Sequence, residues 1–522
     1  MHSTRVLRSG WRQAIRGGAV ALAVLAGSSV LPAFALDRAS TVIISNVGQM
    51  NTLDPLRADY SQTNLIDNTL YDTLLLYDYD KTLVGRLATE FSMADDARSV
   101  AITLRSDVRF HDGTPLTAKD VAYTFDRLKR LGAGVAALAE GYDTTEIVDD
   151  THLTIRLSQP NSLFLGALSK IYILNSALAA ANAGDDDGQA WLQSHDAGSG
   201  PYQIADVTGD NVTVSLFEDY WDKAEGRPEA FLFRRIDESA TSLNELRAGN
   251  IDLAFRLSDR DAVTAASDPA LGVLMLSIPF QTEVVFNTRT GPTADPRVRK
   301  AIRLAYDYEG GLAGLRVGNG SLANGPIPNT LACRPDLPLV KQDLDEAKRL
   351  LAEAGVPDLK ATLRFQPAFE VQQREATLLQ SNLADIGVSL NLEPIAFPNW
   401  LASLKDINAL PQMMLFEDFA QFPDPGVMLV KGYKSDAIGT NRTGYANPEV
   451  DALLDEILAT TDYDRRCELY VKVQEILDAD SVMLDMYSLT RPLVYRVDKL
   501  QPFQAHPTVM TFAPSDLRLV TK

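Results

Sequence analysis

The chain has 522 residues, of which 46% are hydrophobic and 23% are charged, and its formal net charge is −20. This composition is typical of a globular protein. The excess of acid argues against nucleic acid or an anionic membrane surface as a partner, since both require a basic face. The length exceeds the ~250 to 300 residues at which a single core stops growing, so we expect two or more lobes.

The first 35 residues have the order of a secretory signal peptide. Arginines without an accompanying acid precede the apolar run from Ala19 to Val30, and Ala33-Phe34-Ala35 follows. These arginines are Arg5, Arg8, Arg12 and Arg16. A membrane anchor is the alternative, but the apolar run is shorter than the ~20 residues that a span needs. We therefore expect cleavage after Ala35 and a mature protein that is soluble in the periplasm.

The chain contains two cysteines, Cys333 and Cys467. Neither lies where a lipid anchor would be attached, just after the cleavage site. In an oxidising compartment the two could form a disulfide. Two buried free thiols would give the same sequence, so both alternatives stay open.

Strand-like and helix-like segments alternate along the rest of the chain. Four segments rich in β-branched residues predict strands, and four polar residues or pairs predict helix starts. The strands are Thr41 to Ser45, Val100 to Leu104, Thr154 to Leu157 and Val212 to Leu216; the helix starts are Thr117, Asp295-Pro296, Asp343 and Asn447-Pro448. The alternation predicts a mixed α/β chain in two large regions.

One long segment carries a resemblance to a known family. Residues Val108 to Arg127 read VRFHDGTPLTAKDVAYTFDR and resemble the signature segment of the bacterial extracellular solute-binding proteins of family 5, which serve peptide, dipeptide and nickel uptake. Further motifs follow in the family's order, and such an order is hard to meet by chance. They are Leu53-Asp54-Pro55, Gly198-Ser199-Gly200-Pro201-Tyr202, Phe286-Asn287-Thr288 followed by DPRVRKAIRLAYD from Asp295, the helix from Asp343 to Gly355, and Phe422-Pro423-Asp424-Pro425.

The resemblance implies a two-lobed periplasmic-binding-protein fold of the α/β class, in which a two-strand hinge joins the lobes and the ligand lies between them. It places residues 36–283 and 488–522 in the first lobe, with an inserted subdomain at about 81–197. Residues 284–487 form the second lobe. Val284 to Asn287 and Val482 to Met486 are the short apolar segments expected to cross between the lobes.

The function implied by the resemblance is that of the substrate-binding protein of an ABC importer. Such a protein captures a peptide or peptide-like solute by lobe closure and delivers it to an inner-membrane permease with a cytoplasmic ATPase. We expect a monomer that uses no cofactor or metal and binds no nucleic acid. An opine, an oligosaccharide or a metal chelate is the alternative ligand, and a periplasmic chaperone or sensor partner stays open.

The expected ligand contacts depart from those of dipeptide-binding relatives. There an Asp before the Pro-Asp-Pro segment pairs with the ligand's amino group, and an Arg in the second lobe pairs with its carboxylate. The corresponding residues here are Gln421 and Gln366, which would read terminal charges weakly. Asp418, Glu417 or Asp59 could replace the lost acid, although solvation at the surface is the alternative for each.

Aromatic side chains are also expected in the cleft. Phe397 and Trp400 lie in the segment where dipeptide-binding relatives place cleft aromatics, and Tyr60 follows Asp59 in a loop that could face the ligand. Aromatic rings offer large contact area to a peptide side chain, an opine or a sugar. Packing in the core of the second lobe is the alternative for Phe397 and Trp400.

A secreted hydrolase is the competing class of function. His111 and Asp112 could serve it, but no nucleophile motif accompanies them, and Ser199 lacks the Gly-x-Ser-x-Gly elbow. We interpret His111 and Asp112 as part of a solvated turn, and Gly198 to Tyr202 as a tight corner of the scaffold. No enzymatic activity is predicted.

Overall fold

The structure is a computed structural model that describes residues 37–46, 52–58, 61–367, 369–396, 399, 402–403, 406, 410–437, 440–504 and 512–521. The predicted signal peptide lies outside these residues. Strands and helices alternate along the described chain, which confirms the predicted mixed α/β class. In this part of the chain, no helix has both the length and the apolar character that a bilayer span requires.

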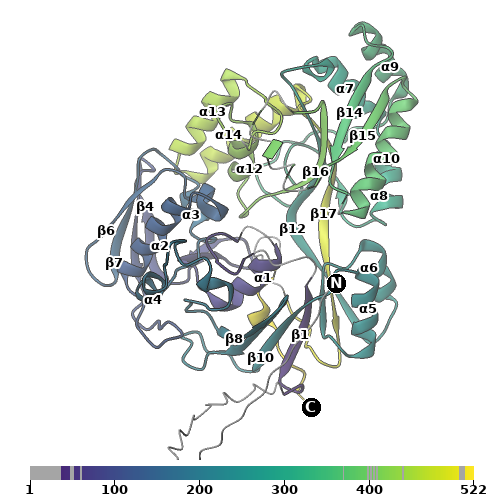
Figure 1. Ribbon diagram of the computed structural model, residues 1–522. Coiled ribbons are helices and arrows are strands. Elements are labelled where there is room, and N and C mark those ends of the chain that lie inside the picture. Colours follow the sequence, from purple (N-terminus) through teal and green to yellow (C-terminus); the bar gives the residue numbers. More distant parts are fainter. Residues whose placement is uncertain are drawn as a thin grey trace, which may run out of the picture. The chain divides into compact units, whose positions relative to one another are not determined.

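A large sheet runs through the described chain (Figure 1). Its strand order is β15-β14-β16-β12-β17-β11-β1-β10-β9-β8, and β13 pairs with β17 outside this path. The strands are β1 (Thr41–Asn46), β8 (Tyr202–Thr208), β9 (Asn211–Leu216), β10 (Ala230–Arg235), β11 (Leu253–Phe255), β12 (Leu271–Phe286), β13 (Ser321–Leu322), β14 (Lys360–Phe365), β15 (Ser389–Pro394), β16 (Met413–Phe419) and β17 (Met483–Arg496).

Strands β12 and β17 form the centre of this sheet. They pair antiparallel from Leu271 opposite Arg496 to Val285 opposite Met483, with two irregularities in register. Strand β16 continues the sheet on one side and β11 on the other. The segments expected to cross between lobes are thus the ends of strands of 16 and 14 residues. The pairing thus extends well beyond the two named segments, and the crossing between lobes at these segments stays a prediction.

Helices flank the sheet, and most of the predicted caps are in place. The side chains of Asp295, Asp343 and Asn447 accept hydrogen bonds from the first turns of α7, α9 and α13. The helices are α1 (Ser61–Leu70), α5 (Ser239–Ala248), α6 (Asp259–Ala266), α7 (Pro296–Ala305), α8 (Tyr308–Leu315), α9 (Leu344–Glu353), α10 (Glu370–Ala384), α12 (Gly426–Tyr433), α13 (Pro448–Ala459) and α14 (Tyr463–Ala479).

A smaller sheet of order β4-β5-β7-β6 lies within the segment expected to form the inserted subdomain. Helix α2 (Ala118–Leu131) begins at Thr117, whose capping box with Asp120 satisfies the first amides. Its predicted apolar face is fully buried. The other elements of this segment are β3 (Leu83–Gly85), β4 (Ala88–Met93), β5 (Ser99–Leu104), β6 (Tyr142–Ile147), β7 (His152–Leu157), α3 (Phe164–Ala167), α4 (Ser176–Ala181) and the short 3-10 helix η1 (Gly134–Ala139), and β2 (Leu75–Tyr77) directly precedes it and pairs with β3.

Two of the sequence motifs meet in a buried ion pair. The guanidinium of Arg127, at the end of the signature segment, donates two hydrogen bonds to the carboxylate of Asp54 at 2.9 and 2.6 Å. Both side chains are 0% exposed. Arg127 also donates to the carbonyl of Asp187 at 2.8 Å. The Leu53-Asp54-Pro55 motif is therefore part of the scaffold that holds α2.

The two glycines of the Gly198 to Tyr202 motif lie against the backbone of Leu70. A Cβ atom at Gly198 would stand 1.9 Å from the Leu70 carbonyl oxygen, and one at Gly200 would stand 2.5 Å from the Leu70 carbonyl carbon. Only glycine allows so close an approach between two backbones. The motif is thus a tight corner, as predicted.

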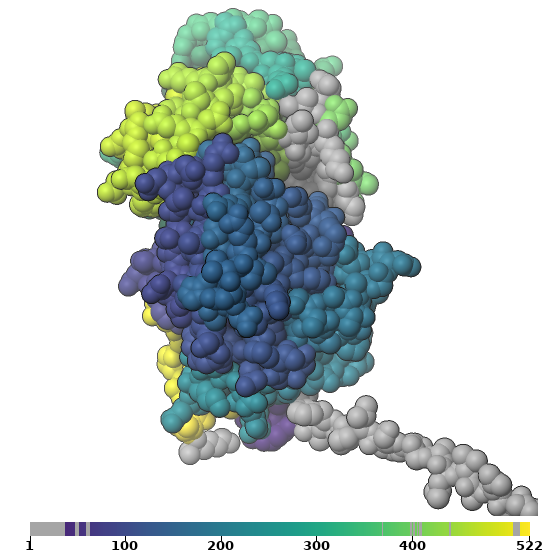
Figure 2. Space-filling model, turned by 90° about the vertical axis from the view of Figure 1, so that its left-hand side faces the viewer, coloured from purple at the N-terminus to yellow at the C-terminus, as the bar shows by residue number. Residues whose placement is uncertain are grey.

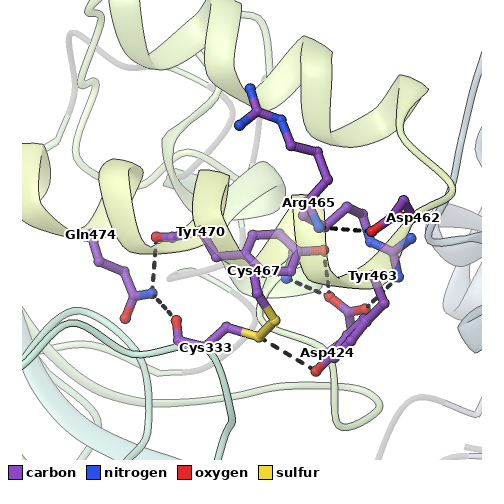
Figure 3. Close-up of a disulfide and its surroundings, with 10 residues drawn as sticks. Cys333, Asp424, Asp462, Tyr463, Arg465, Cys467, Tyr470 and Gln474 are labelled. Carbon is purple, nitrogen blue, oxygen red and sulfur yellow. Dashed lines mark hydrogen bonds and ion pairs between the residues drawn. A yellow bond between two sulfur atoms is a disulfide. The ribbon is translucent and has the colours of Figure 1, made fainter.

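A disulfide joins Cys333 to Cys467 on α14, and Figure 3 shows its surroundings. The Cα atoms are 4.9 Å apart, and the bond closes a sequence separation of 134 residues. Gln474, two helical turns further along α14, donates a hydrogen bond to the Cys333 carbonyl at 2.8 Å. Of the two alternatives that the sequence left open, the structure has the bonded pair.

Candidate functional site

A cavity of about 1030 Å³ lies between two segments that are far apart in the sequence. One wall is formed by the end of α2, η1, the start of β6 and residues 159–163; the other is formed by the segment after β16, α12 and the end of α13. Figure 2 shows the dark-blue surface of the first segment meeting the yellow-green surface of the second. Ser162 donates from its amide and its hydroxyl to the carbonyls of Leu458 and Ile457, both at 2.8 Å.

The Phe422-Pro423-Asp424-Pro425 motif holds the second wall in place. The Phe422 ring packs on Gly166 of α3, where an added Cβ would stand 2.4 Å from the ring. Asp424 accepts hydrogen bonds from the Tyr470 hydroxyl at 2.7 Å and from the first amide of α12, that of Gly426, at 2.8 Å. Gln421 immediately precedes this fixed motif and lines the cavity.

The cavity lining is mixed, and both walls contribute small apolar residues and charged residues. Ala136, Ala137, Leu138, Val427 and Val430 are among its apolar residues. The charged residues are Lys129, Glu140, Lys431, Lys434, Asp436 and Asp455. Of these, Lys434 already pairs with Asp436 at 2.7 Å and with Asp455 at 3.4 Å. Such a lining suits a solute with apolar parts and a few polar groups.

The structure brings one of the predicted ligand residues to this cavity. Gln421 lines it, whereas Gln366 and Asp418 are buried outside the lining. Gln366 follows β14, and its backbone amide donates to the Gln372 side chain at 3.1 Å. The remaining predicted residues lie outside the described part of the chain. They are Asp59, Tyr60, Phe397 and Trp400.

Asp418 is a buried, ion-paired carboxylate. The alternative that it is solvated at the surface was therefore wrong. It accepts a hydrogen bond from Arg442 at 2.9 Å and lies 3.7 Å from the ammonium of Lys431. Burial alone would raise the pKa of Asp418, but Arg442 and Lys431 hold that pKa below its usual value. Glu417 pairs with Arg316 at 2.8 Å.

Sequence reasoning missed a second acidic feature at the centre of the sheet. Glu283 on β12 stands opposite Asp485 on β17, and both are buried. The side-chain amide of Gln281 donates to the carboxyl group of Glu283 at 3.5 Å and to that of Asp485 at 3.4 Å. Burial and the charges of Asp418 and Asp485 raise the pKa of Glu283 well above its usual value, and burial raises the pKa of Asp485 to about 7 despite the nearby Arg303. The sequence does contain a signal for this feature, since Glu283 and Asp485 each lie within a largely apolar run.

This pairing predicts a pH-dependent stability. An acid whose pKa is raised by folding stabilises the fold while it is protonated, and this contribution is lost as pH rises above the unfolded value towards the folded one. We expect Glu283→Gln to melt like the wild type at about pH 4, near the ordinary pKa of a glutamate, and at a higher temperature at pH 8, because the amide replaces the protonated acid without ionising. Differential scanning calorimetry at the two pH values measures this difference.

The control for this prediction is Glu90→Gln, on an exposed position of β4. It should show no such gain at pH 8. An equal melting difference at both pH values for Glu283→Gln would contradict a raised pKa of Glu283 in the folded protein.

A row of two cations and three aromatic rings begins at the cavity with Lys431, and we call it the cation–aromatic strip. The Lys431 ammonium lies 5.7 Å from the ring centre of Phe419, and Phe419 stacks on Phe280 at 6.3 Å. Beyond Phe280, the Arg491 guanidinium lies 5.2 Å from that ring and 5.8 Å from the ring of Phe255. The strip therefore crosses β16, β12, β17 and β11.

His111 and Asp112, the residues of the competing hydrolase hypothesis, make structural contacts with neighbouring residues. The side chain of His111 contacts the Asp196 carboxylate through Nδ1 and lies 3.0 Å from the Gly200 carbonyl through Nε2. Asp112 accepts hydrogen bonds from Thr114 and Asn175. The expectation of a solvated turn was wrong for His111, whose side chain is buried beside Asp196. Burial alone would lower the pKa of His111, but the Asp196 carboxylate raises it above its usual value.

Comparison with known proteins supports one family. The sequence pattern of the bacterial extracellular solute-binding proteins, family 5 (middle region), matches residues 82–440. The probable D,D-dipeptide-binding periplasmic protein DdpA of Escherichia coli (strain K12) is 27% identical over 467 residues, which cover 85% of this chain and 88% of the relative.

Two solved structures have the same fold. The periplasmic binding protein DppA from Helicobacter pylori in complex with the peptide STSA has a TM-score of 0.80 at 22% identity, over 92% of this chain and 98% of its own. The binding protein AgaA of A. tumefaciens R10 in complex with agropinic acid has a TM-score of 0.79 at 23% identity, over 92% of this chain and 99% of its own.

Proposed function

Because this chain belongs to the bacterial extracellular solute-binding proteins of family 5, we propose that it is the periplasmic substrate-binding protein of an ABC importer and captures a peptide or peptide-like solute. Members of the family are transport proteins that bind solutes and are not enzymes. Their curated relatives and structural neighbours are periplasmic binding proteins. We extend this role, without a catalytic activity, to the present chain.

The observation that carries the proposal is the cavity with Gln421 in its lining. Its volume of about 1030 Å³ exceeds the ~300 to 1,000 Å³ of most small-molecule pockets. It can therefore hold more than a single amino acid. The apolar part of the lining suits peptide side chains, and Gln421 lines the cavity directly before the buried, fixed Phe422-Pro423-Asp424-Pro425 motif.

The proposed mechanism is closure of two lobes on the solute. The first comprises residues 36–283 and 488–522 with the subdomain at about 81–197, and the second comprises residues 284–487. Strands β12 and β17 connect them, so small changes at these strands would move one lobe against the other. The solute favours the closed state only through contacts that it makes better there. The closed monomer then meets the inner-membrane permease and its ATPase.

A solute other than a peptide is the second candidate. Gln366 and Gln421 replace the two charged residues that dipeptide-binding relatives use, so the contacts that read peptide termini are absent from these positions. The likeness to AgaA, which was solved with agropinic acid, makes an opine a reasonable class to test. An oligosaccharide and a metal chelate are the other two ligand classes to test. Export by cleavage of the first 35 residues belongs to the proposal as well.

A thermal-shift screen tests the proposal. The protein is unfolded, dialysed and refolded to remove any retained solute, and then heated with tripeptides, an opine, an oligosaccharide or a nickel–histidine chelate. Binding to the folded state alone stabilises it by ~2.7 kcal/mol at a concentration of 100 Kd. We expect one class to raise the melting temperature, and the tripeptides in particular. A rise with the opine alone would favour the second candidate.

A further inference from the structure

The inserted subdomain caps a helix of the proposed second lobe. Ser162 donates hydrogen bonds from its amide and its hydroxyl to the carbonyls of Leu458 and Ile457 in the last turn of α13, both at 2.8 Å. The last carbonyls of a helix have no partner within that helix. Ser162 is buried and lies 295 positions from Ile457, so the end of α13 depends on a distant segment of the chain.

Two apolar residues close to this cap pack in the core of the same lobe. Leu163 is 9% exposed and Ala167 is 1% exposed, and both belong to a cluster of buried hydrophobic residues. Among the described residues, all the other buried members of this cluster lie within residues 285–483, inside the proposed second lobe. A Cβ atom at Gly426, the first residue of α12, would stand 2.7 Å from Leu163 Cδ2. We call residues 162–167 the latch segment.

Phe422 forms the facing side of this contact. Its ring packs on Gly166 of the latch segment and stacks on the ring of Tyr77, with the ring centres 6.3 Å apart and the ring planes at 9°. Tyr77 ends β2, which directly precedes the subdomain. Further along the same hairpin, Lys81 donates a hydrogen bond to the Thr330 carbonyl at 2.9 Å. The contact therefore combines a helix cap, apolar packing and a polar contact at its rim.

The latch segment lies at the edge of the large cavity and joins its two walls. Leu163 lines the cavity on the side of the subdomain, and Phe422 and Leu458 line it on the other side. Leu458 accepts the hydrogen bond from the Ser162 amide, and Phe422 packs on Gly166. The walls can separate only when these contacts are broken, which exposes buried apolar surface to water.

We propose that Ser162 and Leu163 are positioning residues that hold the two walls of the cavity together, so that the closed state is populated before a solute arrives. This inference rests on the proposed function and deepens it, because it identifies what regulates the affinity of that cavity. Apparent affinity falls in proportion to the fraction of the protein that is in the binding-competent state. The latch segment increases the apparent affinity by stabilising that state, and entry and release of the solute require the segment to detach.

Pulsed double electron–electron resonance tests this inference without any solute. Spin labels are attached to cysteines introduced by Lys119→Cys on α2 and Lys348→Cys on α9, at two exposed positions. The labelled protein is unfolded without reductant, dialysed and refolded, so that retained solute is removed and the disulfide is kept. We expect a short distance between the labels to predominate in the protein that is otherwise wild type, and a longer distance to report separation of the walls.

Two substitutions weaken the latch segment. Leu163→Ala leaves a cavity in the shared core only while the walls are joined, so the ratio of the short to the long distance should fall by about tenfold or more. Ser162→Ala removes one hydrogen bond to the end of α13 and should lower the ratio by about threefold. If Leu163→Ala fails to fold, Ser162→Ala carries the test alone.

The matched control is Leu157→Ala, at a residue of β7 that is 5% exposed and packs in the larger core. It should lower the melting temperature, as Leu163→Ala does, and leave the distance ratio unchanged. A long distance alone in the otherwise wild-type protein, a wild-type ratio in the folded latch variants, or an equal fall in Leu157→Ala would overturn the inference. The thermal-shift screen measures solute binding separately, so a protein that binds no solute would contradict the proposed function while the distances still decide the role of the latch segment.

Discussion

Replacement of Asp54 by alanine is expected to lower the free energy of unfolding by about 3 to 5 kcal/mol. Its carboxylate pairs with the Arg127 guanidinium through two hydrogen bonds at 2.9 and 2.6 Å, and both side chains are 0% exposed. The variant leaves Arg127 charged and buried without its carboxylate. Removing one partner leaves a buried charge without compensation. The loss in stability is therefore much larger than the difference between the intact pair and two apolar residues at the same positions.

Urea unfolding followed by circular dichroism measures this loss. The matched control is Asp107→Ala, whose carboxylate pairs with Arg105 at 2.7 Å but whose side chain is 60% exposed. Exposed ion pairs contribute ~0 to 1 kcal/mol, so this variant should unfold close to the wild type. Equal losses for Asp54→Ala and Asp107→Ala would contradict the structural role assigned to the buried pair.

The double variant Cys333→Ser, Cys467→Ser is expected to lose about 5 kcal/mol of stability. The disulfide closes a separation of 134 residues, and a longer loop restricts the unfolded chain more strongly. The bond also attaches the segment that carries Cys333 to α14, next to the motif that includes Asp424 (Figure 3). Loss of the bond should therefore loosen the wall of the large cavity as well as lower the overall stability.

Dithiothreitol provides the control for this prediction. It should lower the urea midpoint of the wild type towards that of the double variant and leave the double variant unchanged. A wild-type midpoint that is insensitive to the reductant, or a double variant that unfolds like the oxidised wild type, would contradict the stabilising role of the disulfide.

The sequence was most informative where local chemistry decides the structure. Helix starts at Thr117, Asp295, Asp343 and Asn447 depend on a polar side chain and the amides that follow it, so composition and spacing suffice. The tight corner at Gly198 could also be predicted from local sequence, because a run of small residues followed by proline permits few other structures. The order of the motifs indicated the family, and through it the fold.

Features that depend on tertiary pairing were beyond sequence reasoning. Residues Glu283 and Asp485 are 202 positions apart, and only the pairing of β12 with β17 brings them opposite each other. The burial of His111 depends on Asp196, which lies 85 residues away. Likewise, the large cavity is formed by two distant segments, so the sequence could single out Gln421 as a candidate ligand residue but could not predict the cavity that it lines.

Native mass spectrometry of the gently purified mature protein tests the central claim most directly. Our account predicts a complex heavier than the mature chain, from which denaturation releases a solute with the mass and fragmentation of a peptide or peptide-like compound. A released sugar, opine or chelate would retain the binding role and change the ligand class. A protein that carries no solute, and that gains none when incubated with peptides, opines, oligosaccharides and chelates, would contradict the account.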